Sequence, residues 1–241
     1  MATRGTPGIP EVADPPRRRA GRPATSILSR TLILETGLRL IDERGADGAG
    51  MRAIAKELGV RPSALYNHVA GYPELVAGVR ELISERIPTD MFDTLPWDQA
   101  LSEWAHHYRA AFAAHPPTIA LLAVLPLSED SVTTEMYERV VASLGRAGWP
   151  VERHLEVLVA VEAFILGAAL DLAADDDMMN PGSRTDVPEY LAAYRARAAR
   201  LAAGGRRAAD LSFETGLRAL LAGLRVELEE LKGPDPDPAA R

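Results

Sequence analysis

A short stretch in the first third of the chain gathers side chains that can bind the edges of DNA base pairs and the phosphates beside them. An arginine donates two hydrogen bonds to guanine O6 and N7, and an alanine methyl group can contact the methyl group of thymine. Because most protein–DNA hydrogen bonds go to phosphate, we expect base reading at Arg61 and Ala64, with Asn67 able to bind adenine or phosphate. The candidate residues are Arg61, Ser63, Ala64, Tyr66, Asn67 and His68.

The residues around this stretch predict two short helices joined by a tight turn, over Met51–Leu58 and Pro62–His68. Ala55 is small enough to let the second helix cross close to the first. Gly59 falls where the turn needs a left-handed backbone conformation, which glycine adopts without strain. Leu65 is the apolar residue that would hold the second helix against the core. The spacing predicts a helix-turn-helix that lies in the major groove, and the alternative is a helical corner without DNA contact.

Longer helices are predicted on both sides of this unit, over about residues 27–44 and 73–87, because apolar residues recur there on one helical face. Gly37 lies in the middle of the first helix and lowers its stability, which is tolerable if a neighbouring helix must approach closely there. Pro88 ends the second helix. We therefore expect a DNA-binding domain over residues 26–87.

Several motifs of this domain are typical of one family of bacterial regulators. They are Leu32–Gly45, Met51–Val60, Ala64–Val69 and Tyr72–Val76. On these motifs, residues 28–87 resemble the DNA-binding head of the tetracycline-repressor (TetR) family. The resemblance implies that Tyr66 and His68 contact bases or backbone and that Arg52 reaches a base or a phosphate. Many relatives carry a lysine where this chain has Tyr72, which can donate one hydrogen bond to DNA but supplies no charge.

Residues 1–25 contain repeated Pro and Gly and almost no apolar periodicity, so we expect them to be disordered in the free protein. Arginines in this segment can form an arm that follows the phosphate backbone or enters the minor groove, whose negative potential favours Arg. A solvated tail without contacts is the alternative. The arginines are Arg17, Arg18, Arg19 and Arg22.

Charge is distributed unevenly along the chain. The net charge of −7 by itself argues against a nucleic-acid partner. Residues 1–87, however, hold 13 Arg and Lys against 10 Asp and Glu, whereas residues 88–241 hold 14 against 24. A basic N-terminal part on an acidic body suits a protein that binds DNA at one end only.

Residues 88–232 predict a helical body, so the whole chain is expected to be all-α, and the resemblance implies that this body serves effector binding and dimerisation. The tail over residues 233–241 is rich in proline and is expected to be disordered. The helices of the body are predicted at Trp97–Ala114, Thr118–Leu125, Glu129–Ala147, Pro150–Leu172, Pro188–Ala203 and Ala208–Leu231.

Two of these helices are candidates for an interface between two copies of the chain. The helix over Pro150–Leu172 is apolar on nearly every face, which indicates burial on all sides. The helix over Ala208–Leu231 contains Gly216 and Gly223, which permit another helix to lie close. The resemblance implies an intermolecular four-helix bundle of this kind, and the alternative is that both helices only fill the monomer core. A homodimer would bind a palindromic operator in double-stranded DNA, with half-sites about 34–36 Å apart.

The body also resembles the C-terminal domain of the tetracycline repressors, at Phe164–Leu170 and Gly216–Leu224. This resemblance implies a repressor that releases DNA when a small-molecule effector enters a pocket in the body. Leu121–Leu127 lacks the His that helps tetracycline repressors hold the drug's magnesium ion, so we expect a mostly apolar effector instead. Packing in the core is the alternative for every aromatic candidate. The candidate lining residues are Trp104, His107, Tyr108, Phe112, Met136, Tyr137 and Phe164.

Other function classes lack their sequence signals. Cys is absent, which rules out thiolate metal sites and suits a reducing cytoplasm, and neither a signal peptide nor an apolar segment of about 18 residues is found. We find no zinc-protease, serine-hydrolase, phosphate-loop or dinucleotide motif, so we expect no catalysis, no cofactor and no metal. Asp175–Asp177 is interpreted as a solvated loop rather than a cation site. The remaining alternatives are a DNA-binding dimer without a small-molecule switch and a helical enzyme.

Overall fold

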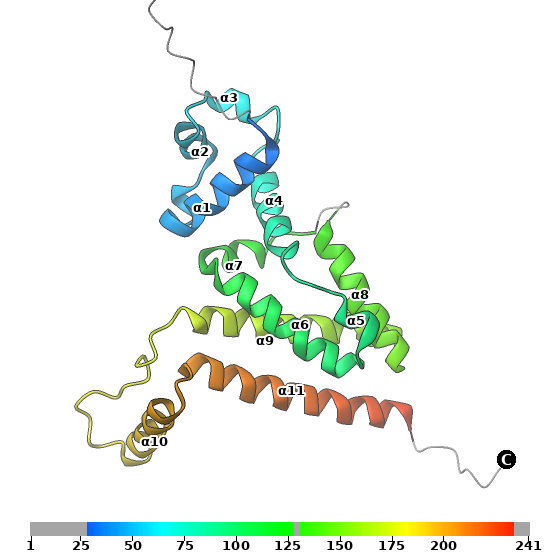
Figure 1. Ribbon diagram of the computed structural model, residues 1–241, viewed down its shortest axis with the longest axis vertical. Helices are drawn as coiled ribbons and strands as arrows, with labels where there is room; N and C mark the ends of the chain where they lie inside the picture. Colours follow the sequence, from blue (N-terminus) through cyan, green and yellow to red (C-terminus); the bar gives the residue numbers. More distant parts are fainter. Residues whose placement is uncertain (1–27, 128–130, 234–241) are drawn as a thin grey trace, which may run out of the picture.

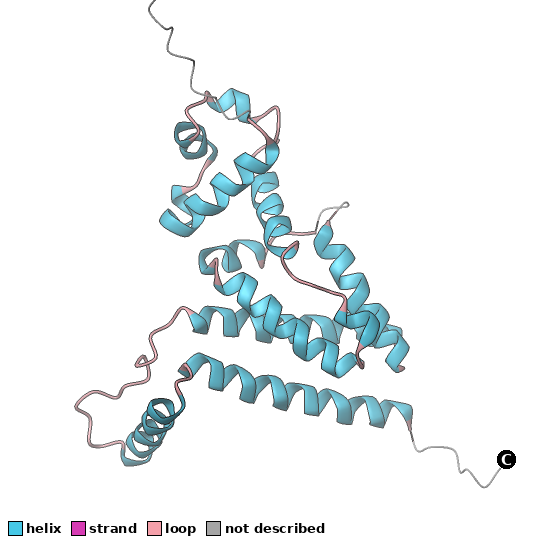
Figure 2. Cartoon of the chain, viewed as in Figure 1, coloured by secondary structure: helices cyan, strands magenta, loops and turns pink. Residues whose placement is uncertain are grey.

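The computed structural model describes residues 28–127 and 131–233, and every regular element within this part is helical. Four helices form a head at the top of the view, and the others form a body below it (Figures 1 and 2). The predicted all-α fold is confirmed. Some predictions concern residues outside the described part: the arm arginines Arg17, Arg18, Arg19 and Arg22, and the tail from residue 234 onward.

The head consists of α1 (Arg30–Gly48), α2 (Met51–Glu57), α3 (Pro62–Leu65) and α4 (Tyr72–Ser84). Helix α1 begins a few residues later than predicted because the Ser29 side chain caps it, with Oγ accepting a hydrogen bond from Leu32 N at 3.2 Å. Gly45 interrupts the end of α1 with a left-handed φ of +71°. The chain is thereby redirected toward α2.

Helices α1 and α4 cross very closely, and glycine makes the crossing possible. A Cβ atom on Gly37 of α1 would lie 3.1 Å from Cδ2 of Leu75 in α4. In return, a Cβ atom on Gly78 of α4 would lie only 2.6 Å from Cδ2 of Leu34 in α1. The close approach predicted at Gly37 is confirmed, and Gly78 is its counterpart on the other helix.

The body follows the prediction with small shifts at the helix ends. Helix α5 was not predicted, because its four residues are too short to show a period. Helix α7 starts at Pro116, two residues before the predicted start at Thr118, since proline suits the first helical turn. The helices are α5 (Met91–Thr94), α6 (Trp97–Ala113), α7 (Pro116–Leu122), α8 (Val132–Ala147), the 3-10 turn Val151–Arg153, α9 (His154–Leu172), α10 (Pro188–Gly204) and α11 (Ala208–Lys232).

Helix α6 lies at the centre of the body and packs against α4, α5, α7, α8, α9 and α11. Trp104 is its largest fully buried side chain. Helix α4 belongs to the head but also packs against α6, α7 and α8, so it joins the two parts (Figure 1). Helix α10 has no buried residue and lies at the lower left of the view. Within the described residues, none of the helices has the length and apolar character that crossing a bilayer requires.

Candidate nucleic-acid interface and ligand cavity

The turn between α2 and α3 has the geometry that its residue types predicted. Gly59 has a left-handed φ of +66°. The chain turns back at once, and Val60 N donates a hydrogen bond to Ala55 O at 2.9 Å. The Ala55 side chain is 1% exposed and Leu65 is fully buried, so both hold the two short helices against the core of the head. The helix-turn-helix is therefore built around these three positions.

Helix α3 itself contains only four residues, fewer than predicted, and a hydrogen-bonded turn extends it. Within this turn His68 N and Val69 N both donate to Leu65 O, at 2.9 and 3.0 Å. The segment forms the upper end of the head in Figure 1, away from the body. Of the candidate residues, Arg52, Arg61, Ser63, Tyr66 and Asn67 are exposed, whereas Ala64 and His68 are half-buried.

Tyr72 differs from the expectation that it contacts DNA. Its hydroxyl group donates a hydrogen bond to Ala46 O at 3.3 Å, and its ring is half-buried against the core of the head. Burial raises the pKa of this hydroxyl group, so it stays protonated. The single donor of Tyr72 is thus directed into the head, where it joins the start of α4 to the end of α1, and is not free to bind a phosphate.

Glu74 holds the segment that follows α3 and was not identified from the sequence. One carboxylate oxygen accepts a hydrogen bond from Ala70 N at 2.6 Å, and the other accepts one from Arg30 at 3.3 Å. The bond from Ala70 is the main reason why the pKa of Glu74 is lowered. A Glu three residues after the N-cap matches half of a capping box, which was the available signal, although Gly71 has no side chain to complete it and the bond comes from Ala70 instead of the N-cap nitrogen.

The arginines of α1 and of the helix-turn-helix fall into two groups. Arg39 and Arg44 form ion pairs with Glu57, and Arg30 forms one with Glu74, so these charges are balanced within the head. In contrast, Arg52 and Arg61 have no carboxylate within ion-pair distance among the described residues. Positive charge that remains unpaired is therefore concentrated at the helix-turn-helix.

The body contains a cavity of about 370 Å³ beside α4. Its walls come from α6, α7, α8 and α9, and from the segment that follows α7. Tyr108 and Phe112 contribute a pair of stacked rings, with centroids 4.8 Å apart and planes 11° from parallel. The lining residues are Arg80, Tyr108, Phe112, Ile119, Leu122, Ala123, Leu125, Pro126, Leu127, Thr133, Tyr137, Val159, Glu162, Ala163 and Leu166.

Of the candidate residues, Tyr108, Phe112 and Tyr137 line this cavity, and the others lie elsewhere. Trp104 packs edge-on against Phe92 and Tyr108 in the core, and Met136 is also buried there. His107 is exposed to solvent. Phe164 stacks on Phe213 and fills the space beside Gly216. None of these four side chains lines the cavity, which corrects their assignment to it: Trp104 shares a face of α6 with Tyr108 but lies one turn earlier, inside the core.

Glu162 places a carboxylate in the wall of the cavity. Its Oε1 accepts hydrogen bonds from the hydroxyl groups of Tyr108, at 2.5 Å, and Tyr137. Burial, followed by the negative charge of Glu162, raises the pKa of both phenols above the usual value, so both remain neutral donors. The sequence held a signal for this group, because Glu162 is the only charged residue between Glu156 and Asp171 in an otherwise apolar helix.

Two adjacent charged residues attach α4 to the ends of two body helices. Arg80 donates to Leu122 O at 2.8 Å, Leu125 O at 2.5 Å and Pro126 O at 3.1 Å, at the C-terminal end of α7. Glu81 accepts from the Ser131 hydroxyl group at 2.7 Å and from the backbone nitrogen of Thr133 at 3.3 Å, at the N-terminal end of α8. A cation at a helix C-terminus and an anion at an N-terminus are the favourable arrangements. Helix α4 is thus fixed to the body next to the cavity.

Comparison with known sequences identifies the kind of protein to which these parts belong. Residues 33–70 match the family described as "Bacterial regulatory proteins, tetR family", and residues 93–228 match "Tetracyclin repressor-like, C-terminal domain". The chain belongs to the TetR family. It is 28% identical over 208 residues to the tetracycline repressor protein class E of Escherichia coli, and the match covers 85% of this chain and 94% of that protein.

Solved structures support the same assignment. The crystal structure of BioQ from Mycobacterium smegmatis is 26% identical with a TM-score of 0.60, covering 82% of this chain and 97% of that one. A structure of BioQ with its natural double-stranded DNA operator is 25% identical with a TM-score of 0.53, covering 70% of this chain and 99% of that one. This TetR-family protein is a DNA-binding transcriptional regulator, in a family of regulators rather than enzymes.

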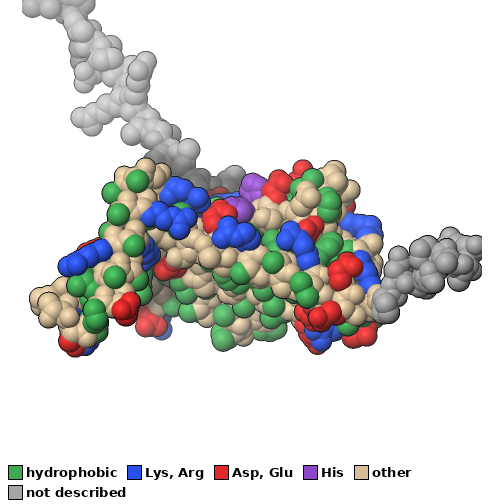
Figure 3. All heavy atoms as spheres, turned by 90° about the horizontal axis from the view of Figure 1, so that it is seen from below, with side chains coloured by type: hydrophobic (Ala, Val, Ile, Leu, Met, Phe, Trp, Pro, Cys, Tyr) green, Lys and Arg blue, Asp and Glu red, His purple; other side chains and the backbone are tan. Residues whose placement is uncertain are grey.

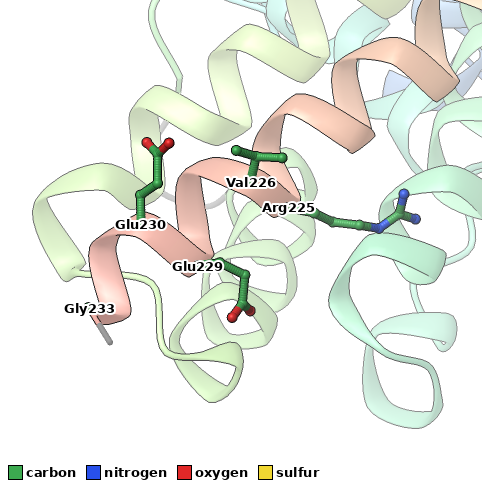
Figure 4. Close-up of a pocket in the computed structure, with 5 residues that line it drawn as sticks. All are labelled: Arg225, Val226, Glu229, Glu230 and Gly233. Carbon is green, nitrogen blue, oxygen red and sulfur yellow. The ribbon is translucent and has the colours of Figure 1, made fainter. Parts of the chain in front are cut away.

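This TetR-family regulator leaves one apolar face of its body open, on α9 and α11. Leu155 and Val159 of α9 are 65% and 55% exposed, and Val226 of α11 is 59% exposed. Seen from below, hydrophobic side chains gather along the lower middle of the body, with charged side chains toward the ends (Figure 3). Near the end of α11, Val226 and Glu230 project from the same side of the helix (Figure 4). We call the exposed apolar surface of α9 and α11 the α9–α11 face.

The glycines of α11 lie in different surroundings. A Cβ atom on Gly216 would lie 2.5 Å from the Phe164 ring, so the close approach predicted there occurs within the chain. Gly223 has no atom within 4 Å of the position of its missing Cβ, and it is exposed.

The described residues include no group of three or more His, Asp or Glu that could hold a metal ion.

Proposed function

We propose that this regulator is a repressor that binds a palindromic operator as a homodimer and is released by a small, largely apolar effector. The observation that carries the proposal is the position of α4, which contacts α1 on one side and contributes Arg80 to the cavity wall on the other. Effector binding in the body can therefore affect the DNA-binding head through α4, and α1 of the head also packs on α7, which contributes to the cavity wall.

The proposed DNA contacts come from the exposed end of the head. Arg61 is the residue that we assign to base reading, together with Ala64, and Arg52 supplies a second unpaired cation. The other side chains of this surface would bind phosphates or bases. Tyr72 is left out because its donor is engaged with Ala46. BioQ, whose fold this chain shares, has been crystallised with its double-stranded operator, and that likeness supports the assignment.

The proposed dimer buries the α9–α11 face. This face is apolar and exposed, and the open side of Gly223 leaves room for a helix of a second copy. The head, in contrast, uses its apolar residues internally and offers no such surface. Pairing two bodies through α9 and α11 would give a four-helix bundle and would present two heads to half-sites about 34–36 Å apart.

The proposed switch acts through the contacts of Arg80 and Glu81. An effector in the cavity must favour the arrangement of the heads that does not bind DNA, since otherwise it cannot shift the equilibrium. Arg80 binds carbonyl groups of Leu122, Leu125 and Pro126, all of which belong to cavity-lining residues. A ligand that displaces this segment would displace Arg80, and with it α4 and the head.

A selection of random DNA duplexes on the purified full chain tests the proposed binding. We expect an enriched palindrome with half-sites one helical turn apart. Arg61→Ala should relax the preference at one base pair in each half-site and weaken binding by about 1–3 kcal/mol. Arg195→Ala, an exposed arginine on α10, is the matched control and should leave the selected sequence unchanged. Enriched sites without two-fold symmetry would contradict the proposal.

Sedimentation velocity at micromolar concentration tests the proposed dimer. Val226→Lys places a charge on the α9–α11 face and should convert the dimer to a monomer, because burying an unpaired charge is costly. Val124→Lys makes the same change at a valine that is 85% exposed on the other side of the body, and it should leave the dimer intact. A monomeric wild-type protein, or equal effects of the two substitutions, would rule out this interface.

A further inference from the structure

The cavity differs from a purely apolar pocket because its wall contains a carboxylate with an oxygen left over. Within the described residues, Glu162 Oε1 accepts both tyrosine hydroxyl groups, while no hydrogen bond reaches Oε2. We infer that the effector is an organic amine, with an aromatic or polycyclic apolar body and a protonated nitrogen that binds Oε2 of Glu162. This inference rests on the proposed effector cavity and specifies the chemical class of its ligand.

The arrangement of the tyrosines keeps the carboxylate available for a cation. Because Tyr108 and Tyr137 both donate to the same oxygen, they fix the orientation of Glu162, which lines the cavity, and the described residues supply no donor to its second oxygen. A hydroxyl group donates only one proton, so neither tyrosine can also bind Oε2. A carboxylate among apolar side chains is stabilised most by an opposite charge, less by a neutral donor, and is destabilised by an anion.

Arg80 also lines the cavity, and its positive charge has to be considered. Its two terminal nitrogens donate to three backbone carbonyl oxygens at the end of α7, and the bonds measure between 2.5 and 3.1 Å. The Leu122 carbonyl group carries the partial negative charge of the C-terminal end of α7, and the Leu125 and Pro126 carbonyl groups add two further acceptors, so the guanidinium charge is offset. Arg80 therefore serves mainly to join α4 to α7, whereas Glu162 retains an unused acceptor.

The walls suit the rest of such a ligand. The stacked rings of Tyr108 and Phe112 present aromatic surface, and aliphatic residues from α7 and α9 complete the lining. Aromatic faces attract cations as well as apolar groups, so they add to the preference for a protonated amine. The cavity of about 370 Å³ accommodates two or three fused or linked rings rather than a long chain.

Calorimetric titration of the full-length wild-type protein tests the inference directly. The probes are matched sets on three scaffolds, namely 4-phenylbenzyl, naphthylmethyl and phenylbutyl, each carrying an amine, an alcohol or a carboxylate. We expect the amine to bind about 10- to 100-fold more tightly than the alcohol on the best scaffold, because the bond to Glu162 is then charge-assisted. The carboxylate should bind most weakly. Equal or tighter binding of the alcohols or carboxylates on every scaffold, or no binding by any amine, overturns the inference.

Glu162→Gln isolates the role of the carboxylate. The amide oxygen can still accept from both tyrosines, so the substitution removes charge with little change in shape. The variant should lose the preference for the amine and keep its affinity for the alcohol. Glu103→Gln, at an exposed position on α6, removes the same charge away from the cavity and should retain the preference. An amine preference that survives in Glu162→Gln contradicts the inference.

A parallel measurement of operator binding separates this inference from the proposed switch. If the amine binds through Glu162 and also releases DNA, both are supported. If the amine binds through Glu162 but DNA remains bound, the ligand class stands and the proposed release fails.

Discussion

In the head, Gly37 and Gly78 lie against leucine side chains of the facing helix, whereas in the body Gly223 of α11 faces open space. The head thus uses its small residues to pack α1 against α4 within a single chain. The body uses Gly216 in the same way but leaves Gly223 and the apolar residues around it exposed. This difference is what the proposed dimer predicts, because the head packs its small residues within one copy while the α9–α11 face is left exposed for a second copy to cover.

The strongest test of a self-sufficient head is Leu65→Ala. Leu65 is fully buried between α3 and the rest of the head, so its truncation leaves a cavity. We expect the free energy of unfolding, measured with urea, to fall by about 2–5 kcal/mol. Tyr66→Ala is the control, because this neighbour is 54% exposed and its loss should affect DNA binding more than stability. Equal losses of stability in both variants would contradict the assigned packing.

A smaller effect is expected from Gly78→Ala. The added methyl group would meet the buried Leu34 side chain at 2.6 Å, and so α1 and α4 must shift or Leu34 must adopt a strained rotamer. Overpacking of this kind should lower the free energy of unfolding by about 1–3 kcal/mol. Gly37→Ala, with 3.1 Å available, should cost less when both are measured by urea denaturation. The reverse order would argue against the observed crossing.

A glycine-to-alanine substitution in the body should instead raise the free energy of unfolding. Gly223→Ala removes a helix-breaking residue where nothing is in contact, so it should stabilise a monomer by about 0.5–1 kcal/mol. We propose to measure this in the Val226→Lys background, in which the monomer is expected to be the only species. In the otherwise wild-type protein, Gly223→Ala should weaken the dimer. A loss of monomer stability would show that the face is already covered within the chain.

The smallest effect is expected at alkaline pH, from the phenols beside Glu162. Burial raises the pKa of Tyr137 in the folded state above its value in the unfolded chain, which is about 10. The contribution of Tyr137 to the free energy of unfolding is therefore fully present below about pH 10 and is lost as the pH rises further. Tyr137→Phe should therefore lose less stability between pH 8 and about pH 11 than the wild type does. Urea denaturation at both values provides the measurement, and Tyr66→Phe, at an exposed tyrosine, provides the control. An unchanged pH dependence in Tyr137→Phe would contradict the contact.

The helix-turn-helix could be predicted from the sequence because each of its constraints is local. Gly59 supplies a backbone conformation, Ala55 supplies space and Leu65 supplies a buried apolar group, all within a few residues of one another. The close approach at Gly37 could be predicted for the same reason, since a glycine inside a helix is unfavourable unless something lies against it. Each of these requirements restricts which residue type can occupy the position, so the sequence reveals it.

The cavity could be predicted only in part, because it depends on how five helices face one another. Tyr108 and Trp104 lie on the same helix, yet only Tyr108 reaches the cavity while Trp104 fills the core. Glu162 was missed although it is an isolated charge in an apolar helix, and Phe164, two residues away, points toward α11 instead. Periodicity identifies the buried side of a helix, but it does not distinguish a packed neighbour from an empty space.

The neighbouring positions of Arg80 and Glu81 limit how α4 can move. Successive side chains of a helix project about 100° apart around its axis. Arg80 therefore binds the end of α7, and Glu81 the start of α8, from different sides of α4. Rotation of α4 about its own axis would lengthen the hydrogen bonds of one of these residues and compress those of the other. A tilt of α4 would change both sets of bonds less. These contacts, together with the packing of α1 on α7, would favour a tilt of the head over its rotation about α4. In the proposed dimer, a change at the cavity would then alter one quantity, the distance between the two DNA-binding heads along the double helix.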